Sequence, residues 1–407
     1  MTHSLDPFMS ALLKTAADKH GSGAVVVADW AKQQFGVGIP HLMLEYLMGL
    51  NVIPYPAIIE LAGPPGSCKS AFLQYLMRVY LEQMFGAVML ETEGKMSGTL
   101  LNSILEDYAA SAVIFPGLNT QELWQRTMTT VLKSYKKYYV DTLKQFQKGK
   151  GELARPLLMC LDSLGAAPSE DSVDAISKTG AAERTFPVEA LKNSRYFAQL
   201  PTRLRDLPVT IMYTNHEMKK ISEGPQFGFG GPVERSTKGG ATPDFFCGIR
   251  LFFEQASKPV EVKKGVFQQN LSIEVYKNSF NQKGNKVSLT MEWNKEIDPE
   301  TNTEIQHTRF LWGKALVNYL APNAPGFKYD RESVKKFLTV TRQSDTKFSC
   351  KELGVSDENP EVLGNLIESN EELVNKLRPY LGIKKWNEYN GTPASSAVPE
   401  ITEDDEE

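Results

Sequence analysis

The feature that most constrains the fold is a loop rich in glycine and proline, placed between an apolar run and a helical pattern. The run Ala57–Ala62 predicts a buried strand, and the pattern after the loop predicts a helix to about Glu82. In this context, backbone N–H groups and the positive end of the helix point at phosphate oxygens. The sequence therefore predicts a nucleotide site formed by Gly63, Pro64, Pro65, Gly66, Ser67, Cys68, Lys69 and Ser70.

Two side chains of this loop carry chemistry of their own. Lys69 would place a positive charge near the outer phosphates of ATP, and the Ser70 hydroxyl would ligate Mg²⁺. Cys68 stands where this kind of loop usually has its last glycine. The alternative is a simple Gly/Pro turn before an ordinary helix, but the strand–loop–helix context favours nucleotide binding, with ATP and Mg²⁺ as the expected ligands.

Two further apolar runs end in acidic residues. Leu157–Leu161 is followed by Asp162, which predicts a carboxylate at the edge of a parallel sheet where ligands bind, and we expect it to hold the Mg²⁺. Ala87–Glu91 is followed by Glu93, which could polarise the water that attacks a phosphate. From the residues alone, Glu91 is an equal candidate for that role, and either acid could simply be solvated.

Strand and helix signals alternate over residues 37–303, which predicts an α/β fold with a mostly parallel sheet and helices on both faces. The last strands follow one another without helices and predict an antiparallel edge. The expected strands are Ala57–Ala62, Ala87–Glu91, Leu157–Leu161, Val209–Thr214, Ile249–Glu254, Leu271–Val275 and Val287–Trp293.

The remaining chain divides into smaller parts. Residues 1–36 carry an amphipathic helix, Asp6–Lys19, and a short strand, a pair that must dock on a larger body. Residues 304–390 predict a small, mainly helical domain, with helices at Phe310–Leu320 and Pro360–Leu377. Residues 391–407 are rich in acid, Ser and Pro, and we expect them to be disordered.

Composition limits the classes of partner. The net charge is −4, so DNA binding would need a local basic surface rather than bulk charge. The four cysteines are scattered without metal-type spacing, and neither a membrane span nor a secretory signal is visible. These features predict a cytoplasmic protein with no membrane partner.

A long irregular stretch follows the run Val209–Thr214. Loops of this length are usually functional or disordered, and this one mixes glycines with cations and aromatic residues, which can contact DNA phosphates and bases. The DNA-binding candidates in this stretch, residues 217–240, are Lys219, Lys220, Phe227, Phe229, Arg235 and Lys238, and the alternative is a flexible surface loop.

The order of these motifs resembles the RecA/RadA/UvsX family of recombinases, and it is most like the phage UvsX-like branch. Glu91-Thr92-Glu93-Gly94 looks like the family's Asp-Thr-Glu-Gly, and the match assigns the catalytic base to Glu93. Asn215-His216 resembles the Asn-His of UvsX-like proteins and implies that His216 senses the outer phosphate. UvsX-like proteins also lack the glycine that Cys68 replaces. Lys277 resembles a lysine that reaches the ATP of the adjacent subunit, although Ser279 stands where a second lysine would be.

The resemblance implies a RecA-like P-loop core, an N-terminal oligomerisation module, and catalysis by Glu93, Lys69 and His216. By position, residues 167–187, with Lys178 and Arg184, resemble the family's first DNA-binding segment, and residues 217–240 resemble its second; the alternative for residues 167–187 is also a flexible surface loop. The resemblance also implies a homo-oligomeric filament on single-stranded DNA that pairs with double-stranded DNA, hydrolyses ATP, and works with a mediator or single-strand-binding protein, in a bacterial host if phage-encoded. Two alternatives stay open: a hexameric DNA helicase built on the same core, and a DNA-coating filament protein with a weak or decayed ATPase.

Overall fold

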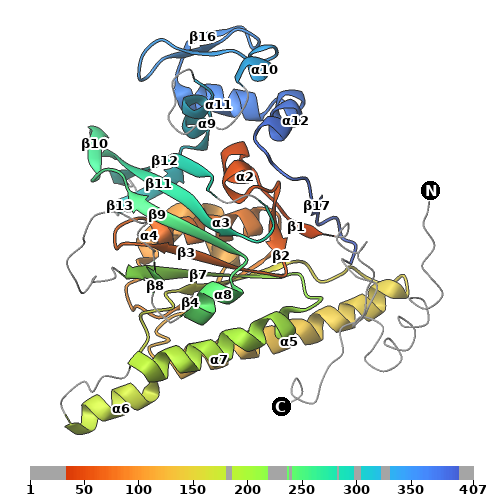
Figure 1. Ribbon diagram of the computed structural model, residues 1–407, viewed down its shortest axis with the longest axis vertical. Coiled ribbons are helices and arrows are strands. Elements are labelled where there is room, and N and C mark those ends of the chain that lie inside the picture. The colour runs from red at the N-terminus through yellow and green to blue at the C-terminus, as the bar shows by residue number, and fades with distance from the viewer. Residues whose placement is uncertain are drawn as a thin grey trace, which may run out of the picture.

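A computed structural model describes residues 34–179, 186–218, 236–237, 241–281, 284–297, 304–321 and 331–393. It is an α/β protein with a mixed, mostly parallel central sheet (Figure 1). Among the described residues this sheet has 11 strands, and its main path runs β13-β12-β11-β9-β3-β7-β6-β4-β5. The predicted helix Asp6–Lys19, the strand after it and the tail from residue 394 lie outside the described residues.

Six strands form the parallel part of the sheet. They are β3 (Ala57–Gly63), β4 (Gly86–Glu91), β5 (Val113–Phe115), β6 (Leu157–Asp162), β7 (Val209–Met218) and β9 (Ile249–Gln255). Four of the expected strands have nearly the expected ends, and a fifth, β7, runs four residues beyond the expected end at Thr214. The sequence analysis did not predict the short edge strand β5.

The predicted antiparallel edge is confirmed. It consists of β11 (Val266–Asn278), β12 (Lys286–Ile297) and β13 (Glu304–Phe310), with β10 (Val260–Lys263) paired to β11. Residues 304–310 therefore continue the central sheet, since they pair with β12, although the sequence analysis had placed them at the start of the C-terminal domain. Long strands joined by tight turns can pair directly and need no crossover helix.

Helices cover both faces of the sheet. Along β6, Leu158 and Cys160 join the core on one face, whereas Met159 and Leu161 join the core on the other, as the alternation of side chains in a strand requires. The first face carries α2 (Leu42–Met48), α3 (Lys69–Glu82) and α4 (Gly98–Leu105), and a 3₁₀ turn, η2 (Glu106–Ser111), follows α4. The second face carries α5 (Gln121–Gln147) and α7 (Phe186–Leu204). The short helices α6 (Glu170–Thr179) and α8 (Ala241–Phe246) complete the set around the sheet.

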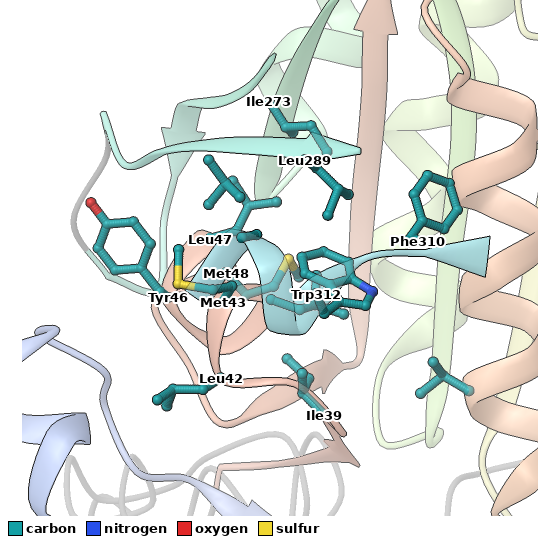
Figure 2. Packing of buried hydrophobic residues seen from close by; sticks show 14 of the residues in the cluster. Ile39, Leu42, Met43, Tyr46, Leu47, Met48, Ile273, Leu289, Phe310 and Trp312 are labelled. Atoms are coloured by element: carbon teal, nitrogen blue, oxygen red, sulfur yellow. The ribbon is translucent and has the colours of Figure 1, made fainter. Parts of the chain in front are cut away.

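The C-terminal unit packs on the antiparallel side of the sheet. Figure 2 shows Trp312 and Phe310 lying against residues of α2 and the strands β11 and β12 in one continuous core. Gly313 and Gly364 let two helices of this unit approach closely, because a Cβ on Gly364 would lie 2.1 Å from the Gly313 carbonyl oxygen. The elements are α9 (Trp312–Leu320), α10 (Arg331–Lys335), β14 (Val340–Arg342), β15 (Phe348–Cys350), β16 (Val355–Glu358), α11 (Pro360–Glu368) and α12 (Glu371–Tyr380).

The single helix expected at Pro360–Leu377 is two helices. Asn370 interrupts it, since its side chain accepts a hydrogen bond from Leu373 N and starts α12 as an N-cap. The chain then returns to the first strands, where β17 (Asn387–Glu388) pairs with β1 (Phe35–Gly38), which in turn pairs with β2 (Val52–Tyr55). No helix in the described part of the chain combines the length and apolarity needed to cross a membrane.

Candidate functional site

The three predicted strand ends meet at the carboxyl edge of the sheet. Gly63 at the end of β3 lies opposite His216 in β7, and Glu91 at the end of β4 lies opposite Asp162 at the end of β6. Because β6 and β7 also pair in parallel, the loop after β3 and the polar groups after the other strands share one edge. This edge is where open α/β sheets bind ligands.

The loop from Gly63 to Ser70 is held by internal hydrogen bonds. Ser67 Oγ donates to Pro64 O at 2.7 Å, and Lys69 Nζ donates to Gly63 O at 2.9 Å and to Pro64 O at 2.8 Å. Gly63 is required by close approach, since a Cβ there would lie 2.3 Å from the Phe253 carbonyl oxygen. The loop therefore has a defined path, and the lysine ammonium lies inside it.

Cys68 adopts the left-handed conformation that glycine favours. Its φ is 60°, and it immediately precedes α3, so the glycine usually found at this position would suit the backbone better. A non-glycine residue in this region costs about 1–2 kcal/mol. Burial raises the pKa of the Cys68 thiol to about 11, so the side chain stays a neutral thiol. The loop thus forms with cysteine at a conformational cost.

Lys69, Ser70 and Asp162 are close to one another. Burial lowers the pKa of Lys69, whereas the negative charges of Asp162 and Glu93 act in the opposite direction. Burial likewise raises the pKa of Asp162, and hydrogen bonds from Thr214 and Ser70 oppose that shift. Ser70 and Asp162, the two predicted Mg²⁺ ligands, are therefore brought together, as the sequence analysis expected.

Glu93 faces His216 across the edge of the sheet. Glu93 Oε1 accepts a hydrogen bond from Ser163 Oγ at 2.7 Å and lies 3.1 Å from His216 Nε2. The His216 contact is the main reason that the pKa of Glu93 falls to about 2, and the Ser163 bond adds to it. His216 Nδ1 is buried and has no partner among the described residues. The predicted base and the predicted phosphate sensor are thus in direct contact.

Glu91, the competing acid, has a different environment. It is only 4% exposed, and its carboxylate accepts hydrogen bonds from Lys95 N at 3.0 Å and Gly117 N at 3.4 Å. The first bond fixes the backbone that leaves β4, and the second fixes the backbone that leaves β5. Glu91 therefore holds the segments on either side of the site, whereas Glu93, two residues later, presents its carboxylate to the site.

A buried ion pair lies directly beneath the nucleotide loop. Glu60 in β3 and Arg250 in β9 are almost wholly buried and bonded through Glu60 Oε2 and Arg250 Nε. Asn215 Nδ2 donates to Glu60 Oε1 at 2.8 Å, and Arg250 Nη2 donates to Thr237 Oγ1 at 3.4 Å. Burial raises the pKa of Glu60, and the Arg250 charge opposes this rise. The pair connects β3, β7 and β9 with β8 (Ser236–Thr237).

Sequence reasoning missed the residues that support the site. Thr92 Oγ1 donates to Ser163 O at 2.8 Å and accepts from Ser163 N at 2.9 Å, which ties the segments after β4 and β6 together. Gln269 Nε2 donates to Gly66 O at 2.9 Å from the antiparallel strand β11. Thr92 could have been suspected, since it lies between the two candidate glutamates, but nothing in the sequence indicates Gln269 or the Glu60–Arg250 pair.

Lys277 does not reach the nucleotide loop of its own chain. It lies in β11 opposite Arg250, which itself pairs with Glu60 in the middle of β3, and its Nζ donates to Phe245 O at 2.9 Å. The expected role of Lys277 concerned the adjacent subunit, so it stays a prediction.

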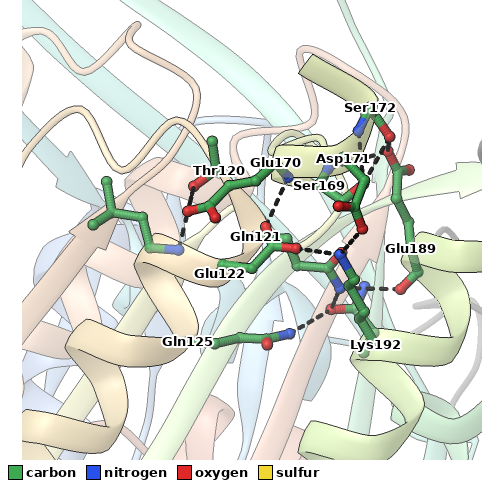
Figure 3. A network of polar contacts seen from close by, with 12 residues as sticks. Thr120, Gln121, Glu122, Gln125, Ser169, Glu170, Asp171, Ser172, Glu189 and Lys192 are labelled. Atoms are coloured by element: carbon green, nitrogen blue, oxygen red, sulfur yellow. Dashed lines mark hydrogen bonds and ion pairs between the residues drawn. The ribbon is translucent and has the colours of Figure 1, made fainter. Parts of the chain in front are cut away.

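The first predicted DNA-binding segment begins at a polar network, shown in Figure 3. Lys192 Nζ in α7 lies 2.5 Å from both Glu122 Oε1 in α5 and Asp171 Oδ2 in α6. Glu189 Oε1 accepts from Ser172 Oγ at 3.1 Å. The network joins α5, α6 and α7. Lys178 lies near the end of α6, and the other predicted DNA-binding residues lie outside the described residues: Arg184, Lys219, Lys220, Phe227, Phe229, Arg235 and Lys238.

The structure describes part of each end of the second predicted DNA-binding segment, residues 217–240. Residues Glu217 and Met218 of β7 pair with Thr237 and Ser236 of β8, in an antiparallel register. The segment between them is therefore closed at its base by a short two-stranded ladder. One side of the ladder continues from His216, and the other carries Thr237, which contacts the buried pair.

Comparison with known proteins gave no match to any family model, and no curated protein is similar to the chain. In the described part of the chain, no three His, Cys, Asp or Glu side chains converge as a metal site. Ser70 and Asp162 could hold a cation only together with ligands from outside the protein, such as phosphate oxygens and water.

Proposed function

We propose that this chain is a RecA-like, DNA-stimulated ATPase that forms filaments on single-stranded DNA and exchanges strands with a homologous duplex. The observation that carries the proposal is the contact between Glu93 and His216 beside the loop Gly63–Ser70. A water-activating acid, a phosphate-sensing side chain and a phosphate-binding loop are the parts that phosphoryl transfer to water requires.

The residues of the loop fit a nucleoside triphosphate. The backbone N–H groups at the start of α3 would bind phosphate oxygens, and Lys69 would exchange its bonds to Gly63 O and Pro64 O for bonds to the outer phosphates. Ser70 and Asp162 would hold Mg²⁺, which when bound would neutralise part of the phosphate charge.

Glu93 would control the attacking water, and His216 would control Glu93. A carboxylate with a pKa of about 2 is a weak proton acceptor, so Glu93 in contact with His216 would orient water rather than take its proton. If the outer phosphate draws His216 away, the pKa of Glu93 rises towards the ordinary value and Glu93 becomes a better base. Since His216 is followed directly by the ladder of the second DNA-binding segment, DNA on that segment could set the position of His216.

The proposal is tested by measuring ATP binding and hydrolysis with and without single-stranded DNA. Lys69→Ala should abolish both, because it removes the only cation in the loop, whereas Lys347→Ala, a surface change in the C-terminal unit, should leave both unchanged. Normal hydrolysis by Lys69→Ala would show that the site is elsewhere. Hydrolysis that DNA does not stimulate would favour the DNA-coating alternative, and rings rather than filaments in negative-stain images would favour the helicase.

A further inference from the structure

A basic stripe runs along the outer side of α5. Arg126, Lys133, Lys137 and Lys144 are spaced by seven, four and seven residues, which places them on one side of a helix. Arg126, Lys137 and Lys144 are exposed, and Lys133 is half-buried. The stripe is about 27 Å long at about 1.5 Å per residue. It stands out in a chain whose net charge is −4.

The stripe lies on the side of α5 that faces away from the sheet. Trp124, Met128, Leu132 and Leu143 turn towards the sheet and fill the core beneath the helix. Figure 1 shows α5 as a long helix beside α7 at one side of the molecule. The basic side chains are therefore not needed for packing.

A pocket between α5 and α7 continues the stripe. It has a volume of about 560 Å³, and its lining includes cations and hydroxyl groups: Arg126, Lys133, Arg203, Thr129, Thr130 and Ser134. Guanidinium, ammonium and hydroxyl groups are the side-chain donors that proteins use to bind phosphate oxygens. The pocket therefore offers the donor set of a phosphate site.

Arg203 is held in place at this pocket. Its guanidinium lies over the Tyr196 ring at 5.8 Å, and it donates to Thr129 Oγ1 and to Gln199 Oε1, each at 2.7 Å. The acid that lines the same pocket, Glu122, is neutralised by Lys192 at 2.5 Å. The pocket thus contains a fixed guanidinium, and the acid in its lining is already paired.

We propose that this α5–α7 face, defined by Arg126, Lys133, Lys137, Lys144 and Arg203, binds the sugar-phosphate backbone of a nucleic acid duplex. The cations along α5 complement the phosphates of a duplex in charge and in length, since about 27 Å of rigid helix matches about eight base pairs at 3.4 Å each. A duplex presents phosphates continuously over that length, and the four cations of α5 are spread over the same length. The contacts would be to phosphate and would carry no sequence preference.

The face adjoins the first DNA-binding segment at the start of α5, where Glu122 accepts hydrogen bonds from Lys192 Nζ and Glu170 N, but most of the face extends away from that segment. The start of α5 is near the carboxyl edge, since Leu118 N donates to Glu91 O, but the helix runs from there towards the opposite edge. There Tyr135 OH donates to Arg155 O at 2.6 Å, and Arg155 Nη1 donates to Met84 O at 3.3 Å, just before β4 begins. A duplex on this face would lie along the outside of the protomer.

The test is the binding of a fluorescent 20-base-pair duplex, measured by anisotropy over a range of salt concentrations without nucleotide. The triple variant Arg126→Gln, Lys133→Gln, Lys137→Gln should bind at least about tenfold more weakly at low salt. Its slope of log affinity against log salt should be shallower by about 2 to 3, since each lost phosphate contact removes about 0.9. The matched control changes three exposed lysines of the C-terminal unit, Lys336, Lys347 and Lys351, to Gln and should bind as the wild type does.

Two outcomes would overturn the proposal. The first is a triple variant with wild-type affinity and salt slope. The second is an acidic peptide that the wild type binds more tightly than the duplex and the triple variant does not bind, which would make the face a peptide site. Because the assay contains no ATP, its result does not depend on the nucleotide site. If the triple variant loses duplex binding but DNA does not stimulate the wild-type ATPase, the proposed role of this face would stand and the proposed recombinase function would be rejected.

Discussion

The carboxyl edge of the sheet and the α5–α7 face both present charged groups, but they are built in different ways. At and just beneath the edge, the acids have close polar partners: Glu60 contacts Arg250 and Asn215, and Glu93 contacts Ser163 and His216. On the α5–α7 face, the cations are mostly exposed, and all but Arg203 of α7 belong to one rigid helix, α5. Coupled buried groups should respond to mutation non-additively, whereas separated surface charges should respond additively.

The largest effect is expected at the Glu60–Arg250 pair. Arg250→Leu would leave Glu60 buried without its cation, which costs about 3–5 kcal/mol in the free energy of unfolding. Because burial raises the pKa of Glu60 and the variant removes the opposing charge, the folded state would take up a proton that the unfolded state releases. The destabilisation should therefore be smaller near pH 5 and grow as the pH rises. Thermal or urea unfolding at two pH values measures it.

The double variant Glu60→Met, Arg250→Leu is the control for this prediction. Replacing both members of a buried pair with apolar residues is often nearly neutral, so the double variant should recover most of the lost stability. Such recovery would show strong coupling at the edge. If the changes in the free energy of unfolding caused by the two substitutions are additive instead, Glu60 and Arg250 would behave as independent surface charges do.

The next effect is expected at Glu93. Glu93→Gln should bind ATP normally and hydrolyse it about 100-fold or more slowly, because the position would keep its hydrogen bonding but lose the negative charge. Glu91→Gln should reduce turnover much less and lower stability instead, since Glu91 bonds to the backbone N–H groups of Lys95 and Gly117. Rapid hydrolysis by Glu93→Gln would move the catalytic role to Glu91.

The pH dependence of turnover sharpens this prediction. In the free enzyme the pKa of Glu93 is about 2, so kcat/KM of the wild type, which reports the free enzyme, should show no loss near the ordinary Glu pKa of about 4.3. The stabilising contribution of the His216 and Ser163 contacts is full above that value and is lost as the pH falls towards 2. His216→Asn removes the main cause of the lowered pKa. It should make kcat/KM fall near pH 4, and an unchanged profile would show that His216 does not tune Glu93.

The sequence predicted the edge far better than it predicted what supports it. Continuous apolar runs located the parallel strands, since strands buried on both faces leave that signature, and the loop Gly63–Ser70 followed from its glycines and lysine. Glu60 could not be predicted in the same way. It is a single acid in an apolar strand, and its partner Arg250 is 190 residues away. Only the parallel pairing of β3 with β9 brings the two together.

The basic stripe on α5 was missed for the opposite reason: its residues stand out in the sequence, but their arrangement does not. Arg126, Lys133, Lys137 and Lys144 are visible in the sequence, but the sequence analysis placed DNA contacts only in the two loop segments. Spacings of seven and four residues place side chains on one side only in a helix. The stripe therefore becomes evident once α5 is known to be a single helix of 27 residues. The pocket with Arg203 needs α7 beside it as well, which is a tertiary feature.

The smallest effect is expected from a single change on the α5–α7 face. Arg126→Gln alone should weaken duplex binding only about two- to fourfold at low salt and reduce the salt slope by about 0.9, since one phosphate contact is lost. Lys137→Gln, four residues beyond Lys133, should behave similarly, and the double variant should show the sum of the two changes in binding free energy. Anisotropy titrations of the wild type, both single variants and the double variant measure this directly.

Additivity is what separates this face from the edge. Arg126 and Lys137 are about 16 Å apart along α5 at about 1.5 Å per residue, which is beyond the distance at which mutations usually couple. A double variant that loses much more than the sum would mean that the two cations hold one ligand group together, as in a built site. A single change at Arg126 that abolished binding would place most of the energy in the pocket beside Arg203, and the stripe itself would then contribute little.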